Sequence, residues 1–247
     1  MIGDGVKQAA DALRAARRVV VLTGAGISAE SGVPTFRGPD GLWRTYRVEH
    51  LATPEAFSRD PTLVWQWYDW RRGLIAKVQP NPGHAVLARW EARWPSFVLI
   101  TQNVDGLHPR AGSRNILELH GNIWKTRCPV DGTIRPNHDV PLAEIPPRCP
   151  FCGGLVRPHI VWFGESLDRD TIRAAYTASR AADVMLVVGT SALVYPAADL
   201  PHAACGTGAT LIEINPDATP LTDDAGISIR GKAGEILPLL DSYLQRG

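Results

Sequence analysis

A glycine-rich turn follows the apolar run Val19–Thr23 and offers a place for a phosphate group. The turn reads Gly24-Ala25-Gly26-Ile27-Ser28-Ala29-Glu30-Ser31-Gly32. A continuous β-branched run is typical of a buried parallel strand that ends at a tight turn. Gly24 and Gly26 permit positive φ and close backbone approach, and the next residues can open a helix whose free N–H groups face an anion. This G-x-G-x-x-[G/A] pattern indicates a dinucleotide site, although a strand with a glycine turn is also common scaffolding.

The residues after the turn argue against a dehydrogenase. In that class a long helix follows the glycines, with an acidic residue roughly 20 positions on. Here Gly32 and Pro34 stop the helix within two turns, and residues 38–41, Gly-Pro-Asp-Gly, extend the break. A polar loop that carries Phe36 and Arg37 would then cover the ligand. This arrangement predicts bond cleavage at the cofactor.

Three further strand candidates end in polar or small residues. Gln102-Asn103-Val104-Asp105 follows the run 97–101, Gly189-Thr190-Ser191 closes the run 184–189, and Asn215-Pro216-Asp217 follows the run 210–214. Any one of these is more often a capped turn than a site. Because ligands of open α/β sheets bind at the carboxyl ends of the strands, four such ends in one sheet favour a site.

His120 stands before a glycine in Leu117-Glu118-Leu119-His120-Gly121-Asn122. A single histidine is more often structural than catalytic. With an unperturbed pKa of about 6.5, however, an imidazole can act as a general base when a substrate hydroxyl comes within reach.

The elements that must hold these residues alternate along the chain. Helices are expected at about 4–18, 83–94, 168–182 and 234–245, between the four strands above and a short one near 227–229. This alternation predicts an α/β fold with an open, mostly parallel sheet. Two segments break it: 61–78, aromatic and helical in character, and 127–158, rich in Pro, Gly and Cys. We expect these insertions to build a smaller domain.

Composition limits the class of protein. The 247 residues are 45% hydrophobic and carry 26 basic and 25 acidic side chains, for a net charge of +1. The chain can bury a full core, and nothing in its charge predicts binding to nucleic acid or an anionic membrane. No apolar run near 18 residues and no signal-peptide pattern is visible, so we expect a soluble, cytoplasmic protein.

Together these motifs resemble the sirtuins, NAD-dependent protein-lysine deacylases. The resemblance rests on the residues 24–37, then Gln102-Asn103-Val104-Asp105, His120-Gly121 and Gly189-Thr190-Ser191, and it extends from about residue 19 to 238. It implies a Rossmann-like core (1–44, 79–123 and 161–247) and a smaller domain of a helical insertion (45–78) and a zinc-ribbon-like module (124–160). NAD and an acyl-lysine peptide would bind between them, in an enzyme that we expect to be a monomer.

The resemblance also assigns roles. His120 would be the general base that deprotonates a ribose hydroxyl, after the acyl oxygen has captured the ribose carbon released by nicotinamide. Asn103 and Asp105 would position the nicotinamide, and Gln102 would position the ribose. Asn103 is also implied to be a catalytic residue. Nicotinamide, O-acyl-ADP-ribose and free lysine would be the products. The implied NAD-binding residues are Gly24, Ala25, Gly26, Ile27, Ala29, Glu30, Pro34, Thr35, Phe36, Arg37, Trp43, Gln102, Asn103, Val104, Asp105, His120, Gly189, Thr190, Ser191, Asn215, Pro216, Asp217 and Ala233.

Tyr68 and Arg71 concern the choice of acyl group. At i and i+3 of a helical stretch they can point into one cavity, although an aromatic helix with Tyr and Arg is more often packing plus a solvated charge. In the sirtuin class that removes succinyl, malonyl and glutaryl groups, Tyr-x-x-Arg binds the distal carboxylate and a small residue like Ala52 widens the pocket. Acetyl removal would persist as a weaker activity. The segment with Val161, Phe163, Gly164 and Glu165 resembles the one that pairs with the substrate backbone.

The cysteines indicate a structural metal with an unusual ligand. Cys149 and Cys152 form a C-x-x-C pair, and Cys128 opens its partner half, in which Asp131 stands where the family has its second cysteine. The spacing fits a zinc site. A Cys3Asp site, three cysteines completed by water or His138, and no metal at all remain open. Cys205 stands apart and is expected to be an ordinary buried thiol.

Two other classes remain open. One is an NAD-consuming ADP-ribosyl transferase or glycohydrolase in the same cleft, which would give no O-acyl-ADP-ribose. The other is a non-catalytic NAD- or metal-dependent binding module, against which His120 and the Asn103–Asp105 set argue.

Overall fold

The computed structural model describes residues 2–35, 41–42 and 47–246. Its helices are α1 (Ile2–Ala15), α2 (Ala25–Ala29), α4 (Pro54–Arg59), α5 (Pro61–Ala76), α6 (Pro82–Trp90), α7 (Leu107–Arg110), α8 (Arg169–Ala181), α9 (Leu200–Cys205) and α10 (Ala233–Gln245), with short 3-10 turns at Val48–His50 and Ala197–Asp199. Its strands are β1 (Arg18–Thr23), β2 (Ser96–Thr101), β3 (Ile116–Glu118), β4 (Gly121–Arg127), β5 (Ile134–Pro136), β6 (Arg157–Ile160), β7 (Val184–Val188), β8 (Thr210–Asn215) and β9 (Ile227–Arg230).

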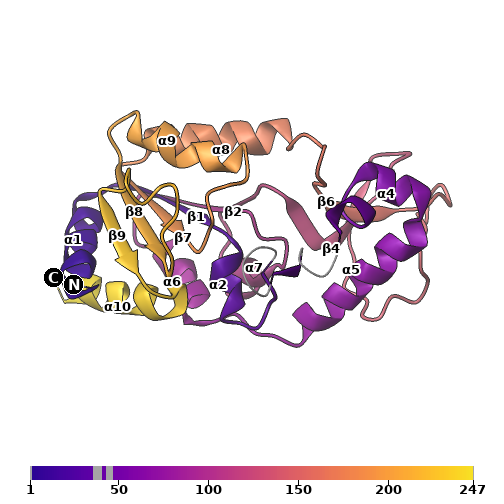
Figure 1. The fold of residues 1–247 in the computed structure, drawn as a ribbon, viewed down its shortest axis with the longest axis horizontal. Coiled ribbons are helices and arrows are strands. Elements are labelled where there is room, and N and C mark those ends of the chain that lie inside the picture. Colours follow the sequence, from indigo (N-terminus) through magenta and orange to yellow (C-terminus); the bar gives the residue numbers. More distant parts are fainter. Residues whose placement is uncertain (1, 36–40, 43–46, 247) are drawn as a thin grey trace.

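The larger sheet has six parallel strands in the order β3-β2-β1-β7-β8-β9. Its central strand β1 is buried at five of six positions, as expected of a strand covered on both faces. Helices α1, α6 and α10 cover one face and α8 and α9 the other (Figure 1). The predicted α/β class with an open parallel sheet is therefore confirmed.

The predicted helices are found with shifted ends, and polar caps explain several starts. Asp168 accepts from the Thr171 N–H ahead of α8, and Asn81 forms a capping box with His84 ahead of α6. Helix α1 ends at Ala15, whereas the helix expected at 4–18 ended at residue 18. Helix α6 ends at Trp90, whereas the helix expected at 83–94 ended at residue 94.

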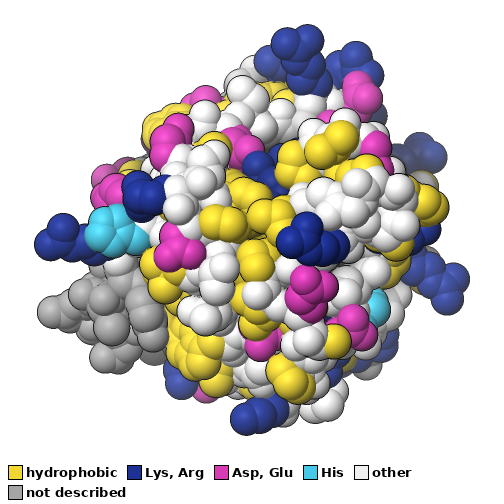
Figure 2. Space-filling view, turned by 90° about the vertical axis from the view of Figure 1, so that its right-hand side faces the viewer, with side chains coloured by type: hydrophobic (Ala, Val, Ile, Leu, Met, Phe, Trp, Pro, Cys, Tyr) yellow, Lys and Arg dark blue, Asp and Glu magenta, His cyan; other side chains and the backbone are white. Residues whose placement is uncertain are grey.

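A second, three-stranded antiparallel sheet, β5-β4-β6, lies with α4 and α5 at one end of the molecule (Figure 1). These elements share an aromatic core that includes Trp65, Tyr68 and Trp162. The sequence did not predict these strands, because none of them contains a continuous apolar run. On this end apolar side chains lie among charges of both signs (Figure 2). The exposed large hydrophobic residues of the chain include Leu63 and Trp70 of α5 and Phe151.

Among the described residues, no helix has the length and apolar character needed to cross a membrane.

Candidate functional site

The carboxyl ends of the strands meet at one edge of the six-stranded sheet, and hydrogen bonds join them there. The Asn103 amide nitrogen donates to the Gly24 carbonyl at 2.9 Å and to the Ser28 hydroxyl at 3.1 Å. The Gln102 amide donates to the Thr190 hydroxyl at 2.9 Å. The ends of β1, β2 and β7 therefore form one connected polar surface.

The glycine corner is needed for close approach rather than for positive φ. Gly24 has a φ of −126°, and neither it nor Gly26 is left-handed, so the freedom of positive φ that glycine permits is not used at these two positions. A Cβ on Gly24 would lie 2.6 Å from the Thr190 Cβ, and one on Gly26 would lie 2.7 Å from the Gly189 carbonyl oxygen. The left-handed residue is Gly189, at φ 59°. Since β1 and β7 are neighbours, their turns press together and only glycine fits.

Helix α2 begins at Ala25 and is only five residues long, which agrees with the early stop expected from Gly32 and Pro34. Gly26 N–H donates to the Gly189 carbonyl at 2.7 Å, so the β7 turn holds the start of this helix.

His120 lies directly before β4 and is half-buried at the same edge. Its Nδ1 is 3.0 Å from the Gln102 carbonyl oxygen, which can only accept, so Nδ1 carries the proton and Nε2 the lone pair. Burial lowers the pKa of His120, and the bond to Gln102 raises it in part. A neutral imidazole with Nε2 as acceptor is the form that a general base needs.

Asp105 is buried after β2 and accepts from the Leu107 N–H at 2.8 Å. Burial raises the pKa of its carboxyl, while the Leu107 N–H, the Ser28 hydroxyl and the charges of Arg71 and Arg110 lower it. The Asp105 carboxyl and the Asn103 amide both bind the Ser28 hydroxyl, and an acid and an amide held by one residue are groups able to bind a carboxamide.

The remaining predicted cofactor residues spread along this edge. Thr35 accepts from the Leu42 N–H at 2.9 Å, and Glu30 accepts from the Gly234 N–H at 2.9 Å, next to Ala233 at the start of α10. Asn215 ends β8, and its amide donates to the Asp217 carbonyl. Ala25, Ile27 and Ala29 lie in α2, and Pro34 lies after it. Val104, Ser191 and Pro216 follow the ends of β2, β7 and β8. Phe36, Arg37 and Trp43 lie outside the described residues.

Tyr68 and Arg71 are both buried in α5. The Arg71 guanidinium lies 4.9 Å from the Trp67 ring centroid and 5.9 Å from that of Tyr68. Burial lowers the pKa of Arg71, whereas Tyr68 and Asp105 raise it. Ala52 is buried in the same core. A phenol and a guanidinium with little exposure to water form a surface suited to a carboxylate.

The segment after β6 is tied to both parts of the molecule. Val161 N–H donates to the His120 carbonyl at 2.9 Å, and Phe163 N–H donates to the Ala52 carbonyl at 3.0 Å. Gly164 is left-handed, at φ 86°. Arg157 binds both oxygens of Glu165, at 2.6 and 2.7 Å. The Glu165 carboxylate therefore holds the segment after β6 to Arg157 at the start of that strand.

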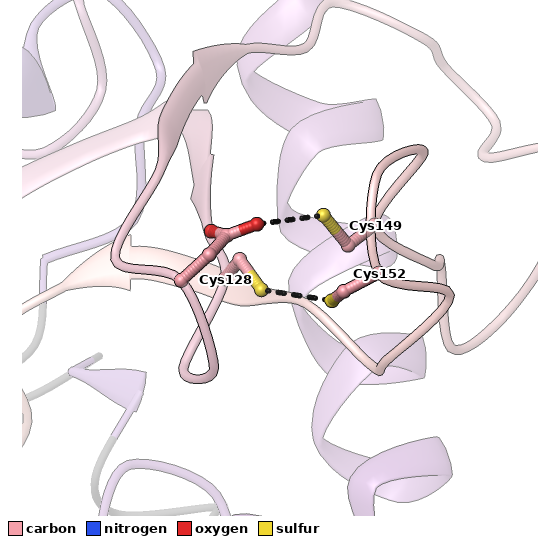
Figure 3. A group of neighbouring side chains, drawn as sticks. Cys128, Cys149 and Cys152 are labelled. Carbon is pink, nitrogen blue, oxygen red and sulfur yellow. Dashed lines mark hydrogen bonds between the residues drawn. The ribbon is translucent and has the colours of Figure 1, made fainter.

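Three thiols and one carboxylate converge between the two loops of the cysteine module (Figure 3). The ligand atoms of Cys128, Asp131, Cys149 and Cys152 lie within 4.8 Å of one another. Tetrahedral zinc with bonds of about 2.3 Å separates its ligands by about 3.8 Å, so the group fits that ion. Of the two side chains considered as a fourth ligand, the structure brings Asp131 into the group, while His138 stacks on Trp124. Thr133 N–H lowers the pKa of Asp131 to about 2, so it is a carboxylate.

Cys205 lies elsewhere and is half-buried, and burial raises the pKa of its thiol.

Sequence reasoning missed the side chains beneath the site. Thr23 and Thr101 are buried and hydrogen-bonded to each other at 2.9 Å, and Thr23 also contacts His108 Nε2 at 3.0 Å. Trp162 donates from Nε1 to the Tyr68 hydroxyl at 2.9 Å. The only signal of these roles in the sequence is the position of each residue beside a motif.

Comparisons with known proteins agree with this geometry. The Sir2 family matches residues 24–196. The chain is 59% identical over 227 residues to the NAD-dependent protein deacylase of Aquifex aeolicus (strain VF5), covering 92% of this chain and 95% of that protein. It is 54% identical over 237 residues to NAD-dependent protein deacylase 2 of Pyrobaculum aerophilum, covering 96% and 95%.

Solved structures of the same fold include a Sir2 homologue–NAD complex, with a TM-score of 0.92, 47% identity and coverage of 97% of this chain and 94% of that one. A Sir2–p53 peptide–NAD+ complex has a TM-score of 0.88 and 34% identity, covering 98% and 99%. With its family match, its relatives and its fold in agreement, the chain belongs to the Sir2 family.

Proposed function

We propose that this protein is an NAD-dependent protein-lysine deacylase that removes succinyl, malonyl and glutaryl groups, and acetyl groups more slowly. The observation that carries the deacylase proposal is the linkage of the glycine corner, Gln102, Asn103 and His120 into one polar edge. The names of the relatives, NAD-dependent protein deacylases, support the same reaction. NAD and the peptide would bind between the Rossmann-like part (1–44, 79–123, 161–247) and the smaller part (45–78, 124–160).

On the NAD side, the residues of this edge bind, orient and take up a proton. When bound, NAD supplies the ribose carbon that accepts the acyl oxygen. Asn103 and Asp105 hold the carboxamide. The pyrophosphate would bind beside the start of α2, where Gly24 and Gly26 let the turn after β1 lie directly against the turn after β7. His120 Nε2 receives the proton of a ribose hydroxyl, and the Gln102 carbonyl stabilises the imidazolium through Nδ1–H.

On the acyl side, Tyr68 and Arg71 select a carboxylate. The guanidinium offers a fork that matches two carboxylate oxygens, and the phenol adds a third donor. Both groups are buried, and a carboxylate can accept charge-assisted hydrogen bonds from them that a neutral acetyl group cannot, so an acidic acyl group is favoured.

The peptide backbone would add to the segment 161–165 as a strand. The hydrogen bonds from Val161 and Phe163 to His120 and Ala52 fix that segment beside the general base. Strand addition of this kind recognises backbone more than sequence.

The test is to incubate the protein with NAD and matched acetyl- and succinyl-lysine peptides and to follow nicotinamide, O-acyl-ADP-ribose and free lysine by mass spectrometry. We expect succinyl preference, and a loss of about 10- to 100-fold in succinyl kcat/KM for each of Tyr68→Phe and Arg71→Met, since charge-assisted hydrogen bonds contribute about 1.5–3 kcal/mol.

The controls separate the parts of the proposal. Acetyl turnover that equals or exceeds succinyl turnover, and that is unchanged in both variants, would remove the acidic-acyl preference. NAD consumption without deacylated peptide would overturn the deacylase proposal and indicate a glycohydrolase.

A further inference from the structure

The oxygen of the Tyr68 hydroxyl accepts a hydrogen bond from a neighbouring tryptophan. Trp162 Nε1, which can only donate, lies 2.9 Å from the Tyr68 oxygen, and both side chains are buried. A tyrosine hydroxyl carries a single proton. Within the described part of the chain no oxygen accepts that proton, so it is available to a ligand.

Trp162 itself is held on several sides. The Arg157 guanidinium lies 3.5 Å from the centroid of its ring, and the Phe57 ring packs against it at 5.4 Å. Its backbone N–H donates to Glu165 at 2.8 Å, and the same carboxylate is bound at both oxygens by Arg157. The indole therefore cannot turn its N–H away from Tyr68 without breaking this packing.

We propose that Trp162 is a positioning residue for acyl specificity: its indole N–H occupies the acceptor side of the Tyr68 hydroxyl and so directs the phenol proton to the distal carboxylate of an acidic acyl group. This inference rests on the acidic-acyl preference proposed above. A phenol without this partner can rotate and accept from other donors, among them the Arg71 side chain 5.9 Å from its ring. Trp162 thus acts through Tyr68 and need not touch the acyl group.

The test is Trp162→Phe, which keeps an aromatic ring between Arg157 and Phe57 and removes the N–H. We expect KM for a succinyl-lysine peptide to rise about 5- to 10-fold, the equivalent of about 1 kcal/mol for one hydrogen bond, with kcat within twofold. KM for the matched acetyl-lysine peptide should stay within twofold. Equal losses for the two peptides would overturn the proposal.

Trp65→Phe is the matched control. Trp65 is fully buried in α5, three residues before Tyr68, and its Nε1 donates to the Val156 carbonyl at 2.8 Å. The variant loses an equivalent N–H from the same core without touching the Tyr68 hydroxyl. The succinyl-to-acetyl ratio should remain that of the wild type, and a ratio changed as much as in Trp162→Phe would contradict the proposal.

A double-mutant cycle shows whether Trp162 acts through Tyr68. In a Tyr68→Phe background, Trp162→Phe should cause no further rise in succinyl KM, because the hydroxyl that it directs is gone. Additive effects would overturn the proposal. If Trp162→Phe does not fold, site-specific replacement by 3-benzothienylalanine retains the two-ring shape and removes the N–H, with the same expected results.

The outcomes separate this inference from the one on which it rests. A wild-type protein without succinyl preference overturns both. A wild-type preference that survives in Trp162→Phe and in the benzothienyl variant overturns only the role of Trp162.

Discussion

At the scale of single residues, the site depends on protonation states fixed by backbone carbonyls and by burial. The Gln102 carbonyl selects the tautomer of His120 with the lone pair on Nε2, and burial keeps the ring neutral. Asp131 differs, because its carboxyl is charged at neutral pH in any case and donation from the Thr133 backbone N–H only lowers its pKa further. The tautomer of His120, by contrast, does not follow from residue type alone.

The pH dependence of turnover tests the state of His120. In the proposed mechanism the neutral ring of His120 is the active form. Because its pKa lies below about 6.5, that proposal predicts activity that is constant through neutral pH and falls only as the pH drops below that value. The measurement is kcat/KM against pH, with NMR titration of the imidazole, whose signal is identified by its loss in His120→Gln. That variant should lose at least about 100-fold in kcat. An acid limb above pH 6.5 that follows the imidazole titration would contradict the assignment.

At the scale of elements, one buried carboxylate organises the turn after β8. Glu213 is 1% exposed and accepts from Thr219, Thr222, Ser228 and Arg230. Arg230 also donates to the Asp217 carbonyl at 2.9 Å. Glu213 therefore connects β8 and β9 to the turn that carries Asn215 and Asp217.

Replacing Glu213 by Gln should weaken this turn. The amide has one acceptor oxygen in place of two, so buried donors lose partners, and we expect the free energy of unfolding to fall by about 1–3 kcal/mol. KM for NAD should rise severalfold while KM for the peptide stays unchanged. Chemical denaturation and steady-state kinetics measure the two effects.

Asp183→Asn is the control, because Asp183 accepts from the Arg17 and Arg18 N–H groups at the amino edge of the same sheet. It should lose stability without a change in KM for NAD. Equal KM effects in both variants would show that Glu213 has no specific role in the turn.

At the scale of the whole molecule, the protein has separate hydrophobic cores. The three thiols and the carboxylate that could hold a metal belong to the core of the smaller part. Cys128 and Cys149 are buried in the aromatic core with Trp65 and Trp162, apart from the cores that cover the two faces of the large sheet. Binding of a metal to these thiols is therefore coupled to the stability of the small core.

Changes at Asp131 should alter metal retention. We expect Asp131→Asn to lose zinc to a chelator faster than the wild type, and Asp131→Cys to lose it more slowly, because a thiolate binds zinc more strongly than an amide or carboxylate. Zinc per chain is measured by elemental analysis after dialysis.

Loss of the metal should lower the unfolding temperature and expose residues 124–160 to protease while the large sheet stays folded. Identical unfolding temperatures and digestion patterns with and without chelator would show that the group makes no structural use of a metal.

The sequence by itself determined the parallel α/β sheet, the positions of its main strands, the glycine corner and the polar residues at four strand ends. These features depend on local order: apolar runs, turn residues and the rule that parallel strands present their carboxyl ends at one edge. Tertiary structure alone decided that Gly189 takes the left-handed turn against Gly26, that Asp131 rather than His138 joins the thiols, and that Trp162 binds a hydroxyl 94 residues away in the chain. Such contacts form only when segments far apart in the sequence pack together, and the local spacing of residues does not show which distant segments will meet.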